Sequence, residues 1–438
     1  MCVPSTHIYI HIYIPTHKHT ASDRPIYDAV KAAADEAAAK ARAAEDQAAK
    51  RALDAEDAKR KALTASLSRF QENTKNDAPR DDRGELVLKR REVHAGRALT
   101  VSTVEWSVAE KTATPTSALE GFLWDKETEV DRFRERVPLA NLVSQCRLSK
   151  VDPTKPKPRD WVGPIRRAAA AAVGGDDSEG TNKTGAFVVV PECKRLEPLT
   201  GSLRKRYDVA KLAKQFVESG SPAISVNCDS VLFGGTLDDI TKAREATGKA
   251  ALALGASSLD SDGVVVPPIL ASDLVLYPYQ LYKLQLAGAD AVNLVGGALA
   301  TKDLLYLTKI ASSLQLQVLV TVTSEAQIEV LNKLPPNSLD GLIVSNRQLE
   351  DFQFDMTGQQ ALDLLKSDVL PEFLERHGDD CIVLVEGRVG IIEREGKGSG
   401  PMGYVEELKA AGATGAIVGG GLSAMSSDET ADLLQTAK

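Results

Sequence analysis

The chain has 438 residues, of which 43% are hydrophobic, and a formal net charge of −8. This length and composition suffice for a large folded domain with extensions, while the acidic charge argues against a nucleic-acid-binding protein. No apolar run approaches the roughly 20 residues of a membrane-spanning helix. The five cysteines have no paired spacing, which indicates a reducing compartment, and histidine is concentrated in the first 20 residues, so no metal centre is expected in the main body.

Residues 1–25 form a low-complexity start in which Ile, Tyr and His alternate. The pattern allows an exposed β-like stretch, a metal-binding tract, or untranslated sequence included by a start site placed too far upstream, which we favour. His and Pro interrupt the apolar positions, which is untypical of a secretory signal.

Residues 26–75 are rich in Ala, Glu, Lys and Arg and predict a charged helix. Large apolar residues are too sparse for a coiled-coil seam, so we expect a single solvated helix or an arm that contacts a protein partner. Residues 76–114 are polar and carry charge runs, and they predict a linker with one short hairpin.

Residues 115–438 predict a folded domain. It starts with an amphipathic helix that ends before Pro138, followed by a Pro-rich crossing segment and a second helix in "DWVGPIRRAAAAA". Beyond Gly185, helical patterns alternate with eight apolar runs: "AFVVV", "AISVN", "VVVPPIL", "AVNLVGG", "QVLVTV", "GLIVSN", "CIVLVEG" and "GAIVGG". A last helix is predicted in "DETADLLQTA".

Continuous Val, Ile and Leu runs are typical of parallel strands buried on both faces. Eight such strands, each followed by a helix, predict a TIM (β/α)₈ barrel with extra N-terminal helices and a helical, solvated N-terminal extension. The alternative, a doubly wound open sheet, requires a Gly-rich turn after its first strand, and this sequence has none there.

In such barrels the active site lies at the C-terminal ends of the strands. The ionisable or polar residues expected there are Glu192, Lys194, Asp229, Asp273, Asn346, Arg347, Glu386 and Arg388. Glu192 and Lys194 are two residues apart at a strand end and should point the same way, either as an active-site pair or as a solvated ion pair. Arg347 could grip a carboxylate or cap the barrel rim. The backbone amides of Gly419 to Gly421 suit a phosphate group.

Motifs along the barrel resemble those of indole-3-glycerol phosphate synthases. They are "ALEGFLWDKETEVDRFRERVPL", "PRDWVGPI", "PECKRLEP", "AISVNCDSVLFGGTLDDI", "ILASDLVLYPYQLYKLQLAGADAV", "VSNRQLEDFQFD" and "LVEGRV" with "AGATGAIVGGGL". The resemblance runs from about Ser117 to the C-terminus. No single motif is unique, but their order is specific.

The resemblance implies a carbon–carbon lyase of tryptophan biosynthesis. Its members close an indole ring on a phosphorylated carboxyphenylamino-deoxyribulose, losing CO₂ and water without a cofactor. Matched residue by residue, it implies catalytic roles for Glu192, Lys194 and Glu386. It implies substrate-binding roles for Arg347, Asn346, Phe233, Gly387, Gly419 and Gly420.

The sequence departs from the family pattern at several functional positions. Ser272 stands where the family has its general-acid Lys, and Thr321 stands where it has a strand-five Glu. The family's strand-six Asn falls at Ser345, next to Asn346, and its phosphate-contacting Ser is Glu197, an anion that would repel a phosphate if it pointed inward.

Three hypotheses follow from the residues and the resemblance. The first is an impaired enzyme of this family, in which Lys194 donates the proton. The second is an inactive barrel that serves as a scaffold and binds a protein partner through its N-terminal helix. The third is an enzyme for another ligand in which Lys194 forms a Schiff base. The Ala-rich extension suggests the plastid (chloroplast) stroma, with the cytoplasm as the alternative.

Overall fold

The computed structural model describes residues 78–90, 104–106, 115–153, 155–171, 186–204, 206–255, 266–378, 380–392, 401–420 and 422, with five residues between 36 and 47. The chain forms two compact units, Met1–Lys59 and Arg60–Lys438. The five described residues of the first unit are helical and exposed, and Lys40 pairs with Glu36 one turn away at 2.6 Å. The low-complexity start, most of the predicted helix over 26–75 and the predicted last helix lie outside the described residues.

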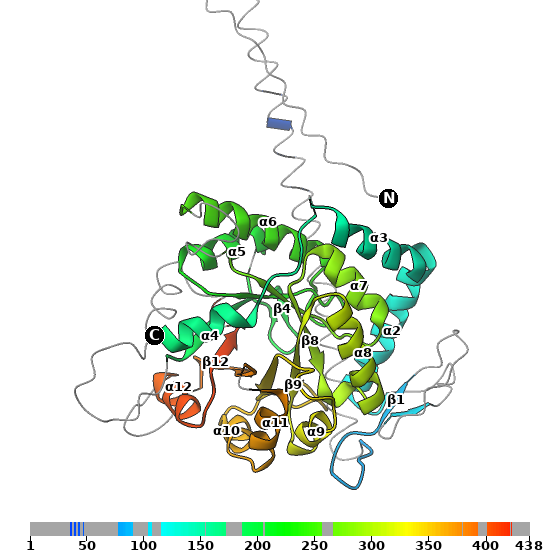
Figure 1. The fold of residues 1–438 in the computed structure, drawn as a ribbon, viewed down its shortest axis with the longest axis vertical. Helices are drawn as coiled ribbons and strands as arrows, with labels where there is room; N and C mark the ends of the chain where they lie inside the picture. Colours follow the sequence, from blue (N-terminus) through cyan, green and yellow to red (C-terminus); the bar gives the residue numbers. More distant parts are fainter. Residues whose placement is uncertain are drawn as a thin grey trace, which may run out of the picture. The chain divides into compact units, whose positions relative to one another are not determined.

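Within the described part of the second unit, eight parallel strands close into a barrel (Figure 1). In barrel order from the first predicted strand they are β3 (Val188–Cys193), β6 (Ile224–Asn227), β7 (Ile269–Ser272), β8 (Ala291–Val295), β9 (Gln317–Val322), β10 (Gly341–Ser345), β11 (Ile382–Glu386) and β12 (Gly415–Val418). β12 closes the ring by pairing with β3. The strands are buried on both faces, as their apolar runs predict. The predicted (β/α)₈ barrel is therefore confirmed.

Helices surround the barrel and return the chain to the start of each next strand. They are α5 (Val209–Glu218), α6 (Leu237–Ala253), α7 (Pro278–Ala287), α8 (Thr301–Ser313), α9 (Glu325–Leu331), α10 (Gln359–Leu365), α11 (Val369–His377) and α12 (Pro401–Ala410), with a 3₁₀ turn η1 (Gly296–Ala298) after β8. Local sequence sets their ends. Asp208 accepts hydrogen bonds from the first amides of α5, and Gly288 ends α7 at a φ of 101°.

The N-terminal end of the barrel is closed by the segment that precedes β3. Trp161, followed by α4 (Val162–Ala171), packs among the inward side chains of the strands, and its indole Nε1 donates to the carbonyl of Ile224 at 3.2 Å. Asp290, fully buried beside these strand starts, is bound by Arg159 and Arg244 at 2.7 Å each. Because side chains fill this end of the barrel, a polar cavity can form only at the opposite end.

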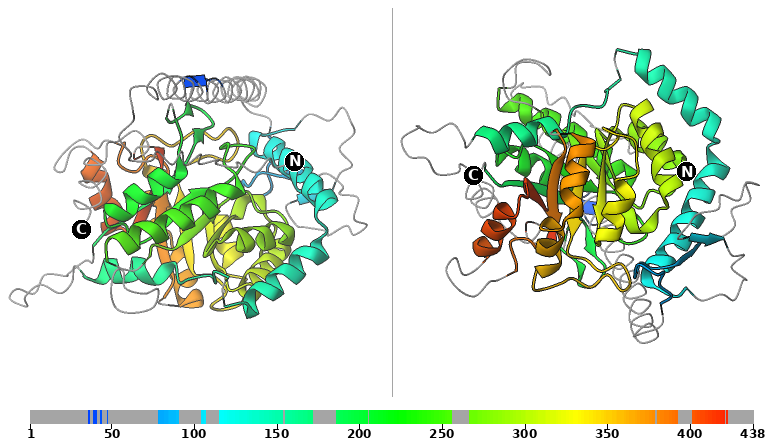
Figure 2. Two further views of the ribbon diagram at one scale, coloured as in Figure 1. Left: turned by 90° about the horizontal axis from the view of Figure 1, so that it is seen from above. Right: turned by 60° about the horizontal axis from the view of Figure 1, so that its bottom comes forward.

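Before α4 the chain forms the helices α2 (Ala118–Arg136) and α3 (Leu139–Val151), and Figure 2 shows them along the outside of the barrel beside α7. The first was predicted, whereas α3 was not. Residues 78–90, inside the predicted linker, pack against α2, and the Trp124 indole donates to the Lys89 carbonyl at 2.7 Å.

Short strands in the predicted linker pair in two ways. β1 (Leu88–Arg90) pairs with β2 (Val104–Trp106) in parallel, so these two do not form a hairpin. An antiparallel bridge joins Arg80 to Leu86 across a tight turn. Among the described residues, no helix combines the length and the apolar character needed to cross a membrane.

Candidate active site

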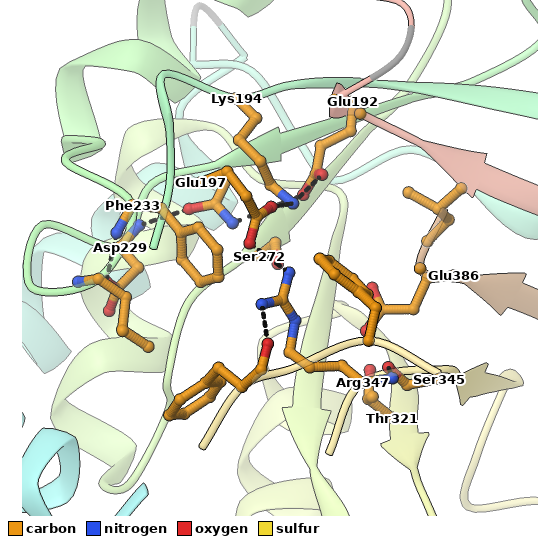
Figure 3. A pocket seen from close by; sticks show the side chains of 18 of the residues that line it. Glu192, Lys194, Glu197, Asp229, Phe233, Ser272, Thr321, Ser345, Arg347 and Glu386 are labelled. Atoms are coloured by element: carbon orange, nitrogen blue, oxygen red, sulfur yellow. Dashed lines mark hydrogen bonds and ion pairs between the residues drawn. The ribbon is translucent and has the colours of Figure 1, made fainter. Parts of the chain in front are cut away.

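A cavity of about 280 Å³ opens at the C-terminal ends of the barrel strands (Figure 3). All eight strands contribute lining residues, and Leu119 of α2 adds to the wall. Of the predicted site residues, those that line the cavity are Glu192, Lys194, Glu386, Arg347, Phe233, Gly387, Gly419 and Gly420. The cavity thus gathers residues that lie more than 200 positions apart in the sequence.

Glu192 and Lys194 form a buried ion pair with 2.8 Å between Lys194 Nζ and Glu192 Oε2. The Lys194 side chain is only 11% exposed, and its ammonium lies 4.9 Å from the centre of the Phe233 ring. Burial by itself lowers the pKa of Lys194, but the carboxylates of Glu192 and Glu197 more than offset it and raise that pKa above its usual value. Lys194 is therefore cationic at neutral pH, and the burial of the pair excludes the solvated alternative.

Glu197 is carried into the cavity by a small hairpin that follows β3. The hairpin pairs β4 (Leu196–Glu197) with β5 (Gly201–Ser202), and Gly201 provides a φ of 82°. Glu197 Oε1 lies 2.7 Å from Arg347 Nη2, and Oε2 lies 3.8 Å from Lys194 Nζ. Burial alone raises the pKa of Glu197, but Arg347 and Lys194 outweigh it and lower that pKa below its usual value. The anion that we predicted to repel a phosphate does point inward, so the part of the cavity wall beside Arg347 is unsuited to a phosphate.

Arg347 follows β10 and is fully engaged by the chain itself. Besides Glu197, it donates through Nη1 to the carbonyl of Phe352 at 3.1 Å, and its guanidinium lies 4.1 Å from the centre of the Phe354 ring. Of the two interpretations of this arginine, gripping a carboxylate is the one observed, but the carboxylate belongs to Glu197.

Asn346 is turned away from the cavity, contrary to its predicted binding role. Its Nδ2 donates to the Tyr404 hydroxyl at 2.8 Å, and its Oδ1 accepts from the Ala361 amide at 3.1 Å. The side chains of adjacent strand residues point to opposite faces, so Ser345 takes the inward place that Asn346 leaves.

The positions of the other departures also line the cavity. Ser272 ends β7, and the Thr321 hydroxyl is bonded to Asn293 Oδ1 at 3.0 Å. Glu386 ends β11, where burial, together with the charge of Glu192, raises the pKa of its carboxyl against the lowering effect of Lys194. A raised pKa brings a carboxyl closer to the range in which it exchanges protons at neutral pH.

Lys126 of α2 is an ionic residue that sequence reasoning missed. Its Nζ lies 2.7 Å from Glu129 Oε2, 2.7 Å from Asp229 Oδ2 and 2.8 Å from Asp273 Oδ1. The side chain is 1% exposed and does not line the cavity. Its place three to four residues after the buried Phe122 and Leu123 was the available signal.

Lys126 does not replace the proton donor that is absent at Ser272. Burial lowers its pKa, but the three carboxylates outweigh this and raise the pKa well above its usual value. Such an ammonium is a poor acid and has no access to a ligand. In the described ranges, no cluster of three or more His, Cys, Asp or Glu side chains could hold a metal ion.

Comparison with known proteins gives one consistent family. A family model described as indole-3-glycerol phosphate synthase matches residues 179–371. The indole-3-glycerol phosphate synthase of Rippkaea orientalis is 30% identical over 256 residues, which cover 58% of this chain and 73% of that protein. The same enzyme of Microcystis aeruginosa is 28% identical over 275 residues, covering 63% of this chain and 79% of that protein.

Solved structures are more distant. The orotidine 5'-phosphate decarboxylase of Pyrococcus horikoshii OT3 aligns with a TM-score of 0.35 and 17% identity, covering 57% of this chain and 98% of that one. A tryptophan synthase complex from Pyrococcus furiosus aligns with a TM-score of 0.33 and 15% identity, covering 58% of this chain and 95% of that one.

Proposed function

The chain belongs to the indole-3-glycerol phosphate synthase family, and on that premise we propose that it performs the family's ring closure slowly, with Lys194 as the proton donor. The reaction converts carboxyphenylamino-deoxyribulose phosphate into indole-3-glycerol phosphate with loss of CO₂ and water. The observation that carries the proposal is the buried Glu192–Lys194 pair, which shares one cavity with Glu386 at the C-terminal ends of the strands.

Each of these three residues has a role that its surroundings support. Lys194 is cationic and lies within the cavity, so it can protonate the ketone oxygen as the aromatic ring attacks the carbonyl carbon. Glu192 orients that ammonium and supplies negative charge beside the cationic intermediate. Glu386, with its raised pKa, is the base that accepts a proton during dehydration.

The same surroundings explain why turnover should be slow. The carboxylates that raise the pKa of Lys194 make it a weaker acid, and a general acid works best when its pKa is near the operating pH. Ser272 cannot take over, since a serine hydroxyl is not a cationic donor at neutral pH.

Turnover by the full-length protein tests the proposal. Indole-3-glycerol phosphate formed from the family substrate is followed by its indole fluorescence. We expect slow turnover, and a loss of about 100- to 10,000-fold in Lys194→Ala, the usual range for a removed general acid. Lys214→Ala, an exposed lysine on α5, is the matched control and should keep full turnover. No turnover by wild-type protein with a cooperative melting transition would refute the proposal.

That last outcome would favour the second candidate function, a catalytically inactive barrel that acts as a scaffold. Ser272, Thr321 and Glu197 support it, because each replaces a functional group of the family and each lines the cavity. A scaffold predicts that the full chain co-purifies with a protein partner and that removal of residues 1–75 abolishes this association.

The plastid stroma is the compartment we propose, supported by the Ala-rich extension predicted over residues 26–75. Microscopy of the full chain with a C-terminal fluorescent tag in a photosynthetic cell tests it, and a purely cytoplasmic signal would contradict it.

A further inference from the structure

The cations that line the cavity differ in whether the chain already uses them. Among the described residues, these cations are Lys194, Arg347 and Arg388. Lys194 is held by Glu192, and Arg347 is held by Glu197. Arg388 forms no ion pair within 4 Å in the described part of the chain, although its charge helps to lower the pKa of Glu197. Its guanidinium carbon lies 4.8 Å from the centre of the Phe354 ring.

Arg388 also has an unsatisfied polar atom. Its Nε is buried and has no hydrogen-bond partner in the described structure. Buried polar groups are nearly always hydrogen-bonded, so an orphaned donor on a cavity wall indicates a group that a ligand completes. A guanidinium offers a fork of donors that suits the oxygens of a phosphate or carboxylate.

The backbone conformation at Arg388 also indicates a ligand site. Gly387 and Arg388 both have a positive φ, 93° and 62°. Glycine adopts this region freely, but an arginine there is strained. Such strained residues cluster at ligand sites, where the surrounding structure holds them in place for a functional reason.

The two glycines Gly419 and Gly420, after β12, differ in how much free space lies beside them. A Cβ added to Gly419 would lie 2.4 Å from Glu192 Oε2, so the Glu192 carboxylate already covers that glycine and would repel a second anion. A Cβ on Gly420 would meet only the Leu203 side chain at 3.9 Å. Arg388 and Gly420 both line the cavity, and they follow the seventh and eighth strands, whose loops commonly bind phosphate in barrels.

The remaining charge excludes a second anionic group. Glu197 occupies Arg347 in the way that a ligand carboxylate would. Four further carboxylates line the cavity, those of Glu192 and Glu386 and, paired with Lys126, those of Asp229 and Asp273. The rest of the wall offers apolar side chains, among them Leu119, Leu232, Leu274, Leu349 and Phe352, which suit an uncharged ring.

We propose that Arg388 binds the single anionic group of this cavity's ligand, and that Glu197 rejects ligands with a carboxylate, so that the site selects small phosphate monoesters with an uncharged apolar remainder. The inference rests on the proposed function, since it takes this cavity as the place where the family's compounds bind. Indole-3-glycerol phosphate belongs to the selected class, whereas the family substrate carries a carboxylate as well. The protein would then hold its product more tightly than its substrate.

Calorimetric titration of the full chain tests the selection without any turnover. The two ligands are indole-3-glycerol phosphate and the substrate reduced at its ketone, which cannot cyclise. We expect indole-3-glycerol phosphate to bind at least about tenfold more tightly than the reduced substrate, because one charged hydrogen bond contributes about that difference in affinity. In Glu197→Gln the reduced substrate should gain about tenfold and indole-3-glycerol phosphate should change little. Equal affinities in the wild type, or no gain in Glu197→Gln, would overturn the role of Glu197.

Arg388→Gly tests the anion site in a variant that should fold, because glycine suits the local φ of 62°. We expect its melting temperature to be maintained and its affinity for indole-3-glycerol phosphate and inorganic phosphate to fall by about 10- to 100-fold. Arg132→Gly would disturb helix α2, so Arg132→Gln, at an exposed position, is the control and should bind normally. Wild-type affinity of Arg388→Gly for indole-3-glycerol phosphate and inorganic phosphate would overturn the proposal.

The two proposals fail in different ways. Turnover without preference for the monoester would refute the selection and leave the ring closure standing. Binding of indole-3-glycerol phosphate through Arg388 without any turnover would refute the ring closure and leave the selection standing.

Discussion

Two lysines at the same end of the barrel differ in what their ion pairs are for. Lys126 lies within 2.8 Å of three carboxylates and is 1% exposed, away from the cavity. Lys194 lies 2.8 Å from one carboxylate and 3.8 Å from another, is 11% exposed and lines the cavity. Both have a raised pKa. Strong pairing therefore does not distinguish a structural lysine from one that can act on a ligand, whereas access does.

The two lysines also differ in how much each contributes to stability. Asp229 and Asp273 are fixed by Lys126 from another element, α2, so this lysine holds the helix on the barrel. Glu192 and Glu197 border a cavity that admits water. If Lys194 is removed, Glu197 still has its ion pair with Arg347. Removal of each lysine should therefore affect stability by different amounts.

The largest expected effect is the loss of stability in Lys126→Met. Methionine retains the apolar stem but leaves buried carboxylates without a cation, and breaking a buried pair in this way costs about 3–5 kcal/mol. Urea denaturation of the full chain measures the free energy of unfolding. Lys214→Met, exposed on α5, should change it by less than about 0.5 kcal/mol. A loss for Lys126→Met no larger than this control would mean that the three-carboxylate cluster is not what holds α2.

A smaller loss of stability is expected in Lys194→Met. Water in the cavity can solvate Glu192, and Asn227 Nδ2, 3.5 Å from Glu192 Oε1, remains beside it, so we expect a cost of about 1–3 kcal/mol. The same denaturation series measures it. If Lys194→Met proved as destabilising as Lys126→Met, the contrast between a structural and an accessible lysine would not hold.

The fold was readable from the sequence because it depends on local patterns that repeat. Each apolar run was long enough for a strand, and helical patterns alternated with these runs. The helix α3 was missed, since its weakly amphipathic residues follow Pro138 without a capping side chain. The packing of residues 78–90 was missed because a polar stretch does not reveal that Leu88 is buried against the core.

The site was predicted only as a set of residues, because their pairings depend on tertiary structure. Alternation along one strand was enough to bring Glu192 and Lys194 together. Asn346 was placed in the cavity from its position at a strand end and from the family resemblance, although the adjacent Ser345 lines it. That Glu197 would engage Arg347, 150 positions away, could not be derived from spacing.

The smallest expected effect is a change in the pH dependence of stability. It compares the two lysines through their influence on the Glu386 carboxyl. Glu386 has a raised pKa in the folded protein because it is buried, and Lys194 opposes that rise. From the unfolded pKa of about 4.3 upward to the higher folded value, the native state therefore binds more protons than the unfolded state. Stability should fall as pH rises through this window, and Glu386→Gln should remove the part of the fall that Glu386 contributes. Asp273, Asp303 and Asp340 also have raised pKa values and keep their own contributions.

Denaturation of the full chain in steps between pH 4 and pH 8 measures this slope. In Lys194→Met the opposing charge is gone, so the pKa of Glu386 rises further and the fall in stability extends to higher pH. In Lys126→Met the fall also grows, because Asp229 and Asp273 lose the cation that lowers their pKa values, but this growth should remain when Glu386→Gln is added. If Glu386→Gln removed the added fall equally in both lysine variants, Glu386 would be responding to general loosening of the barrel end, and the distinction between the two lysines would then rest on access alone.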